Sequence, residues 1–274
     1  MPSVRSKLVR FMLKHMHLLR GRIKREVIDF DTSIEKLREN VTKSAARMGK
    51  LPKGIKIMAA SFGDFYAEWV EPEGCSPEQA ILYFHGSGFV MGTSKDHRTL
   101  VGKLVARCGV KALVFDYSLA PEHPFPAAVN DSVSIYRWML NQGFKPENIV
   151  FVGDSAGACI ALSTLLVLKD GNEPMPAAIV AISPCTDLTC SGQSHITKMK
   201  RDPVTPKGAT KTYTTYYIGK GDPHNPYMSP LFGDLRGLPP VMIQVGEDET
   251  LLDDSLRFAQ RAKEAGVVTE LHVW

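Results

Sequence analysis

The pentapeptide Gly153-Asp154-Ser155-Ala156-Gly157 limits the possible folds of this chain more than any other feature. It follows the apolar run at 149–152 and precedes a second apolar run at 158–162 with helical character. A serine flanked by glycines between a buried strand and a helix fits the G-x-S-x-G pattern. The turn is so tight that bulky side chains are excluded two residues before and after the serine. We therefore predict that the turn lifts the Ser155 hydroxyl above a sheet, where it can act as a nucleophile.

Short apolar runs alternate with helical patterns from residue 55 onward. Strands are predicted at 55–60, 65–70, 80–84, 112–115, 149–152, 178–182, 241–245 and 269–273, and helices at 97–108, 128–142, 156–169 and 254–265. This alternation predicts βαβ units and a mostly parallel sheet of the α/β class, with the first two strands as an antiparallel pair. Most of the later strands are almost continuously apolar, as is typical of a sheet covered on both faces.

Three further segments are expected to be helical. Residues 3–25 fit a basic amphipathic helix and residues 33–48 a second helix, while the stretch 188–238 is too long for a plain connection and has a helical pattern at 206–217. We expect residues 1–50 and 188–225 to form a helical cap on an α/β core spanning 51–274. A first helix that lies on a membrane surface is a less favoured alternative.

Composition excludes several classes of protein. With 274 residues, 44% of them hydrophobic and 23% charged, the chain can fold as one globular unit. A net charge of +4 is too mild to indicate a nucleic-acid partner. The five cysteines form no CxxC pair and no cluster with histidine, so we expect no metal, no cofactor, no disulfides and a cytoplasmic location. No apolar run is long enough to span a membrane, and Lys14, His15 and His17 interrupt the apolar core that a signal peptide needs. We expect no stable membrane association, and the sequence leaves a homodimer open.

A second small-residue loop, His85-Gly86-Ser87-Gly88-Phe89, follows the predicted strand at 80–84. In α/β-hydrolases this position holds the oxyanion loop. We predict that the N–H groups of Ser87 and Gly88, with that of Ala156, face the negative charge that develops in acyl transfer. An ordinary glycine-rich turn is the alternative, and a phosphate-binding loop is disfavoured because no G-K-[ST] follows. We expect His85 to orient the loop by hydrogen bonding.

Together these motifs resemble those of the bacterial hormone-sensitive-lipase-like carboxylesterases of the α/β-hydrolase fold. The resemblance rests on HGSGF at 85–89, YSLAPEHPFPAA at 117–128, GDSAG at 153–157 and GEDETLLDDS at 246–255. It implies an eight-stranded, mostly parallel sheet flanked by helices, with the N-terminal helices in the cap. The chain departs from the family pattern at Ser87, where HGGG is usual, and at Ser118, where YRLAPE is usual.

The resemblance also assigns a triad acid. In this fold the acid follows a late strand, here the one predicted at 241–245, and the family pattern places it at Asp248. Its role would be to hold the imidazole tautomer and to stabilise the imidazolium. Glu249 is a weaker candidate. We expect the neighbouring carboxylates to be surface charges or helix caps: Glu247, Glu249, Asp253 and Asp254.

The triad histidine of the family follows the last strand, just beyond the position that matches Trp274. We therefore expect the sequence to be truncated at its C-terminal end, before the base and a helix that covers the sheet. His272 lies inside the predicted last strand and is a poor substitute. A chain without the base should be weakly active or inactive, because loss of a triad member leaves only the acceleration from oxyanion stabilisation and binding.

Two functions of different classes are thus in view. The favoured one is a serine esterase that cleaves short- to medium-chain carboxylic esters through an acyl-enzyme. The alternative is a non-catalytic protein that binds a small molecule on a hydrolase scaffold. Retention of Ser155, Asp248 and the HGSG loop argues against the alternative. A dinucleotide-binding protein is excluded because no G-x-G-x-x-G follows the first parallel strand.

Overall fold

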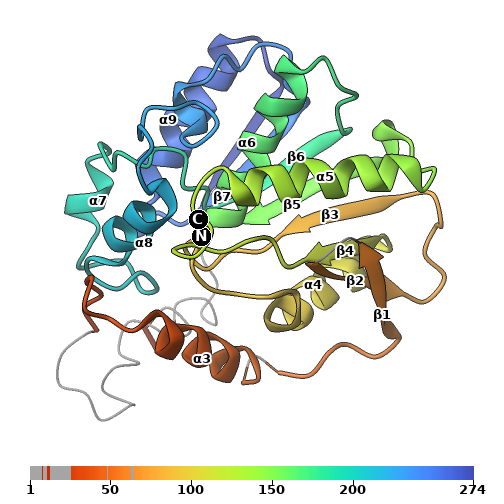
Figure 1. Ribbon diagram of the computed structural model, residues 1–274, viewed down its shortest axis with the longest axis horizontal. Helices are drawn as coiled ribbons and strands as arrows, with labels where there is room; N and C mark the ends of the chain where they lie inside the picture. Colours follow the sequence, from red (N-terminus) through yellow and green to blue (C-terminus); the bar gives the residue numbers. More distant parts are fainter. Residues whose placement is uncertain (1–7, 9–10, 13–25, 48, 63–64) are drawn as a thin grey trace.

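An eight-stranded sheet forms the centre of the molecule (Figure 1). The computed structural model describes residues 8, 11–12, 26–47, 49–62 and 65–274. Most of the helix predicted at 3–25 therefore lies outside the described residues. The spatial strand order is β1-β2-β4-β3-β5-β6-β7-β8. The strands span Ile55–Phe62, Phe65–Pro72, Ala80–Phe84, Lys111–Phe115, Ile149–Asp154, Ala178–Ile182, Val241–Val245 and Thr269–Val273.

The sheet has the predicted mixed character. β1 and β2 form an antiparallel hairpin, and β2 also pairs antiparallel with β4. Every pairing from β4 across to β8 is parallel. This arrangement confirms the prediction of an α/β fold with a mostly parallel eight-stranded sheet. In a parallel sheet the carboxyl ends of all strands meet at one edge, and ligands bind outside that edge.

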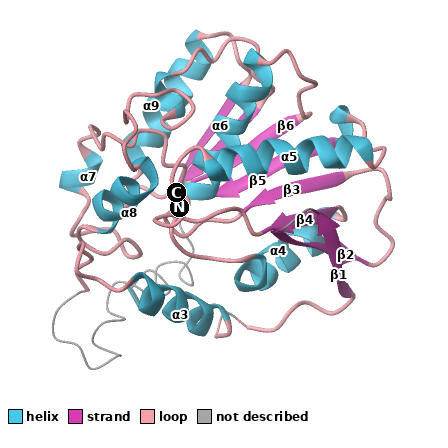
Figure 2. Ribbon diagram, in the orientation of Figure 1, coloured by secondary structure: helices cyan, strands magenta, loops and turns pink. Residues whose placement is uncertain are grey.

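Helices pack on both faces of the sheet (Figure 2). From residue 26 onward, the described α-helices are α3 (Ile34–Ala45), α4 (Ser94–Cys108), α5 (Ala127–Asn141), α6 (Ala156–Asp170), α7 (Ser194–Thr197), α8 (Ala209–Ile218) and α9 (Leu252–Glu264), and the 3₁₀ turns are Pro146–Asn148 and Pro230–Phe232. Because side chains alternate along a strand, Leu82 and Phe84 belong to the large core with α5, α6 and α9, whereas Ile81 and Tyr83 join a smaller cluster with α4.

Burial differs between the middle of the sheet at β3 and the side that carries β6 and β7. All five residues of β3 are buried, as the sequence predicts. β6 and β7 instead alternate, so that Ile243 is buried while Met242 and Gln244 are half-exposed. The prediction of two-sided cover is therefore wrong for this end among the described residues. The reason is positional, because α4 packs on β2 and β4 and does not extend across β6 and β7.

The segment between β6 and β7 carries α7 and α8 beside the carboxyl edge. In Figure 1 the arrowheads of β3 and β5 point toward α8. The N-terminal residues reach the same region, because Val27 forms a parallel bridge with Lys207 and the Ile28 amide donates to the Lys207 carbonyl over 2.9 Å. Two segments that are far apart in the sequence thus lie together next to this edge.

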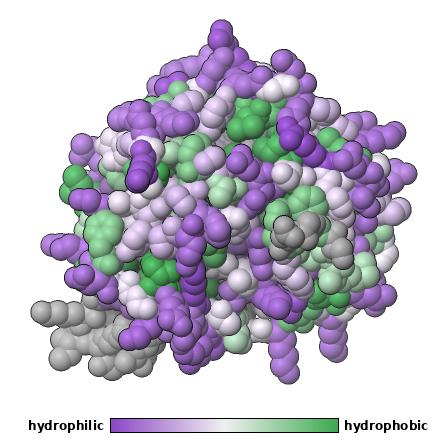
Figure 3. Space-filling view, viewed as in Figure 1, coloured by the Kyte–Doolittle hydropathy of each residue, from purple (hydrophilic) through white to green (hydrophobic). Residues whose placement is uncertain are grey.

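The face drawn in Figure 3 is mostly hydrophilic, with separate small hydrophobic patches. Among the described residues, no helix combines the length and apolar character that crossing a bilayer requires.

Candidate active site

Ser155 lies in the sharp turn between β5 and α6. Its backbone dihedrals, φ 52° and ψ −117°, fall outside the regions that non-glycine residues usually occupy. Ser155 is half-buried and follows the carboxyl end of β5. The Ser155 amide donates to the Ile182 carbonyl over 2.8 Å, which extends the β5–β6 ladder into the turn.

The flanking glycines let α6 approach the sheet closely. A Cβ on Gly157 would lie 2.1 Å from the Phe84 carbonyl oxygen and 2.4 Å from that of His85. A Cβ on Gly153 would lie 2.8 Å from the Ala158 nitrogen. No side chain fits at these distances. The sequence pattern therefore has a direct steric cause.

Asp154 links this turn to the oxyanion loop. Its Oδ1 accepts hydrogen bonds from the Tyr83 hydroxyl at 2.8 Å and from the Gly86 amide at 3.0 Å. In the G-x-S-x-G pattern Asp154 is only the variable residue before the serine, so the motif does not predict these contacts. The structure brings the two predicted loops together through its carboxylate.

Three predicted oxyanion donors lie on these two loops. Ser87 and Gly88 have φ values of 87° and 70°, and Ala156 opens α6. Hydrogen bonds among the described residues use none of these three N–H groups. Ser87 stands where the family usually has glycine, and it adopts the left-handed φ that favours glycine. Unsatisfied amides at a helix start and in a tight loop form a suitable site for an anion.

His85 is buried beneath the loop. Its Nδ1 lies 3.0 Å from the Gly86 carbonyl, and its ring stacks on Tyr117 with centroids 4.2 Å apart. The Tyr117 hydroxyl donates to the His85 carbonyl over 2.6 Å. Burial, with the nearby His97, lowers the pKa of His85 to about 3, so the imidazole is neutral at pH 7. This geometry suits a residue that orients the loop.

Asp248 lies in the loop after β7, at the same edge as Ser155. β6 lies between β5 and β7 in the sheet. The carboxyl ends of β5 and β7 are therefore two strand spacings apart, roughly 9.5 Å. That span is similar to the width of an imidazole with a hydrogen bond on either side. Arg201, from the segment between β6 and β7, places Nε 2.8 Å from Asp248 Oδ1.

Two neighbouring carboxylates are not surface groups, and that expectation was wrong for them. Glu249 is half-buried, and its Oε1 accepts from the Gly246 amide at 2.8 Å. Asp254 is fully buried and accepts from the amides of Thr186 and Asp187. The first turn of α9 points Asp254 inward, where these amides compensate for its desolvation. Glu247 is exposed, as expected.

The six described histidines occupy distinct surroundings. His195 Nε2 lies 2.8 Å from Asp254 Oδ2, and His272 Nε2 lies 2.8 Å from Glu270. His97 Nδ1 contacts the Thr93 carbonyl, His224 contacts Asp222, and His123 is exposed. His272 is in β8, as predicted, and its side chain is 38% exposed.

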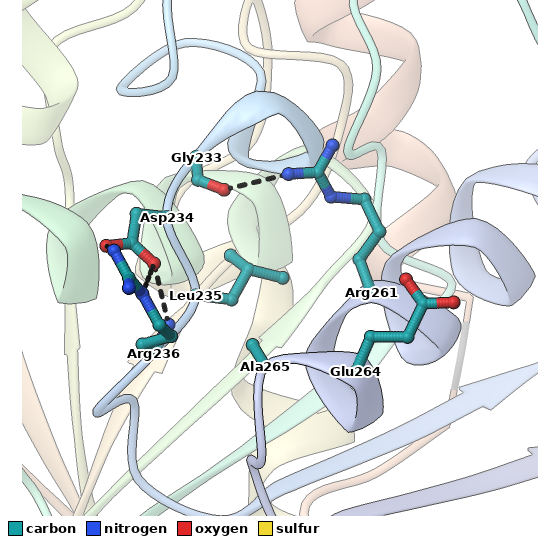
Figure 4. Close-up of a pocket in the computed structure, with 7 residues that line it drawn as sticks. All are labelled: Gly233, Asp234, Leu235, Arg236, Arg261, Glu264 and Ala265. Carbon is teal, nitrogen blue, oxygen red and sulfur yellow. Dashed lines mark hydrogen bonds and ion pairs between the residues drawn. The ribbon is translucent and has the colours of Figure 1, made fainter.

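A shallow hollow elsewhere in the molecule has different properties (Figure 4). It is about 300 Å³ in volume and is lined by Gly233, Asp234, Leu235, Arg236, Arg261, Glu264 and Ala265. These residues precede β7 and β8, so the hollow lies at the amino edge, opposite Ser155. Arg236 pairs with Asp234 and Arg261 donates to the Gly233 carbonyl. The hollow is therefore separate from the candidate active site.

Several residues that support the site were missed from the sequence. Tyr83, Tyr117 and Arg38 are the main ones, and Arg38 donates through Nε to the Val90 carbonyl at 2.8 Å just beyond the oxyanion loop. Tyr83 and Tyr117 lie in or beside strands that the sequence identifies, but their partners are about 30 to 70 residues away. No local pattern signals such contacts.

Comparison with known proteins defines the class of this fold and site. A family model described as "alpha/beta hydrolase fold" matches residues 81–274. An acetyl-hydrolase of Streptomyces hygroscopicus is 41% identical over 212 residues, 77% of this chain and 71% of the relative. An esterase of Acinetobacter venetianus is 41% identical over 196 residues, 70% of this chain and 64% of the relative.

Solved structures agree. The crystal structure of an esterase from the bacterial hormone-sensitive lipase family superposes with a TM-score of 0.90 at 36% identity, covering 100% of this chain and 89% of that one. An esterase/lipase from an uncultured bacterium gives 0.89 at 38% identity, with coverage of 100% and 88%. The class defined by fold and site is that of carboxylic-ester hydrolases. The chain belongs to the alpha/beta hydrolase fold family, among its hormone-sensitive-lipase-like carboxylesterases.

Proposed function

We propose that this protein is a serine esterase that cleaves short- to medium-chain carboxylic esters through an acyl-enzyme. The proposal is supported by a half-buried Ser155 in a turn that Asp154 links to the oxyanion loop, and by three N–H groups, of Ser87, Gly88 and Ala156, that have no partner among the described residues. A protein that only binds a ligand has no need of a strained serine beside an anion site. No observation favours that second function.

The chemistry follows from this arrangement. The Ser155 oxygen attacks the ester carbonyl carbon and its proton passes to a general base. The carbonyl oxygen becomes an oxyanion that the three amides stabilise, and the alcohol leaves with the proton from the base. Water, which gives a proton to the base, then attacks the acyl carbon, and the base returns that proton to the Ser155 oxygen as its bond to the acid breaks.

Asp248 is the proposed triad acid, which orients the base and stabilises its cationic form. The base remains a prediction from the family resemblance, which assigns it to a histidine that follows the last strand. The loop after β7 and the end of β8 are joined, because the Glu247 amide donates to the Trp274 carbonyl over 2.8 Å. A residue that follows β8 would thus enter the edge that carries Asp248.

The proposed cap consists of residues 1–50 and 188–225. Contacts between residues 27–30 and the segment that leads into α8 support this pairing. A cap made from two separate segments implies a pocket of limited depth, which favours short to medium acyl chains. The name of the Streptomyces relative, an acetyl-hydrolase, agrees with that preference.

Hydrolysis of p-nitrophenyl butyrate by the full-length protein tests the proposal. Ser155→Ala should reduce the rate by at least about 10³-fold, because the nucleophile is lost while binding is kept. Asp248→Asn should reduce kcat by a similar factor, and the exposed neighbour variant Glu247→Gln should retain it. Equal rates for the wild type and Ser155→Ala would refute the proposed role of Ser155.

A further inference from the structure

The oxyanion loop has a backbone that needs support. Ser87, Gly88 and Phe89 have successive φ values of 87°, 70° and 66°, all in the left-handed region. Non-glycine residues there cost roughly 1–3 kcal/mol each and persist only where the surroundings enforce them. The lower side of the loop is held by the Asp154 carboxylate and the Tyr117 hydroxyl.

The upper side of the loop is covered by one face of α8. The ring of Tyr213 lies against Gly88, where an added Cβ would be 2.4 Å from Tyr213 Cδ2. The ring of Tyr217 stacks on Phe89, with centroids 4.1 Å apart and an interplanar angle of 16°. Residues four apart lie on the same face of a helix, so two turns of α8 cover two successive loop residues.

The N-terminal residues hold α8 in this position. Ile28 is buried, and its carbonyl accepts from the Thr212 hydroxyl at 3.5 Å. The Tyr216 hydroxyl donates to the Phe30 carbonyl over 3.3 Å. On the other side, the Phe125 amide donates to the Tyr217 carbonyl over 2.8 Å. The helix is therefore fixed on both sides, and the ring of Tyr213 cannot easily withdraw from Gly88.

We propose that Tyr213 is a positioning residue for ester hydrolysis, whose ring holds Gly88 in the conformation that presents its N–H to the oxyanion. The inference rests on the function proposed above. The proposed role belongs to the aromatic ring of Tyr213 and not to its hydroxyl, because the Tyr213 atoms nearest Gly88 are ring carbons. Burial, with the charge of Glu26, raises the pKa of the Tyr213 hydroxyl to about 12, so the group stays neutral and is not offered as an acid or base.

Chain-length kinetics test this role. With p-nitrophenyl acetate, butyrate and octanoate, Tyr213→Ala should lower kcat about tenfold on all three esters, with KM changed less than about threefold, because an oxyanion donor acts in the transition state. Tyr213→Phe should keep the wild-type kcat. Thr215→Ala, an exposed change on the same helix, serves as the control. An unchanged kcat, or a loss confined to one chain length, would overturn the inference, since the latter indicates a pocket wall.

A double-mutant cycle gives an independent readout. Gly88→Ala should lower kcat by steric conflict with the ring and by strain at positive φ, and adding Tyr213→Ala should recover part of that loss. Strictly additive losses would contradict the contact. Ser155→Ala is run alongside. If its rate equals the wild-type rate, the proposed function fails. If hydrolysis depends on Ser155 but not on Tyr213, only the positioning role fails.

Discussion

At the scale of single residues, the site depends on side chains that are absent as much as on those that are present. Ser155 can occupy its turn because the residues at 153 and 157 add no Cβ where helix and sheet meet. Charged side chains in the interior depend instead on the partners that surround them. Asp254 and His195 are buried together, and their pairing and two backbone amides replace the water they lose.

Gly157→Ala tests the steric argument. The new methyl group would overlap the carbonyls of Phe84 and His85, so α6 must shift from the sheet. We expect a loss of about 3 kcal/mol in the free energy of unfolding and loss of esterase activity. Urea denaturation and ester hydrolysis measure both. Gly171→Ala is the control, since its φ is −79° and a Cβ there meets nothing closer than 3.2 Å. Comparable stability of the two variants would argue against close approach at Gly157.

The His195–Asp254 pair predicts a pH dependence of stability. Burial alone would lower the pKa of His195. The hydrogen bond to Asp254 and the charges of Asp254, Asp187 and Asp253 outweigh burial, and the net effect is a raised pKa. Burial also raises the pKa of Asp254. Both shifts mean that the folded state binds more protons than the unfolded state. The contribution of His195 is therefore complete below its ordinary pKa of about 6.5 and is lost as pH rises through the higher folded value.

Urea unfolding of the wild type and His195→Gln at pH 5.5, 7 and 9 checks the sign. The stability advantage of the wild type should be largest at pH 5.5 and smallest at pH 9. His123→Gln, at an exposed position, should show no such trend. A difference independent of pH would mean that His195 contributes by packing alone.

At the scale of elements, the buried Leu37 and the guanidinium of Arg38 attach α3 to the core. Arg38 donates to the carbonyls of Val90 and Ala120 and, through two nitrogens, to the Glu122 carboxylate at 2.8 and 2.7 Å. Val90 lies just after the oxyanion loop, and Ala120 is the last residue of the YSLA segment. An N-terminal element thus braces the loops beneath the site.

Arg38→Ala should loosen α3 by about 2 kcal/mol, because hydrogen bonds of a charged donor to three groups are lost. Arg38→Lys should not restore them, since an ammonium group cannot match the planar fork of the guanidinium. Limited proteolysis within residues 26–47 measures the loosening. Lys36→Ala, exposed on the same helix, is the control, and equal cleavage rates for the two alanine variants would show that Arg38 does not anchor α3.

At the scale of the whole molecule, stability is expected to decline from the middle of the sheet to its edges. β3 and β4 have neighbours on both sides and are buried on both faces, whereas β1 and β8 are edge strands with exposed residues. Hydrogen bonds in strands that open only with the core exchange most slowly.

Amide hydrogen exchange should therefore protect β3 and β4 more than about 100-fold relative to β8, which corresponds to about 3 kcal/mol in opening free energy. Mass spectrometry of peptic peptides resolves these strands. Protection of β8 equal to that of β3 would contradict this gradient. It would indicate that a partner covers the edge.

The sequence alone determined the order of strands and helices, the α/β class and the two glycine-bearing loops, because periodicity and turn chemistry are local properties. The predicted bounds of β3, β6, β7 and β8 match the observed ones, and those of the other four strands differ by at most two residues at either end. The supports of Gly88 and Asp154, the burial of Asp254 and the anchor at Arg38 were decided only by tertiary structure. Each depends on a partner far along the chain, and the free energy that fixes such a contact comes from packing and desolvation after the elements have met.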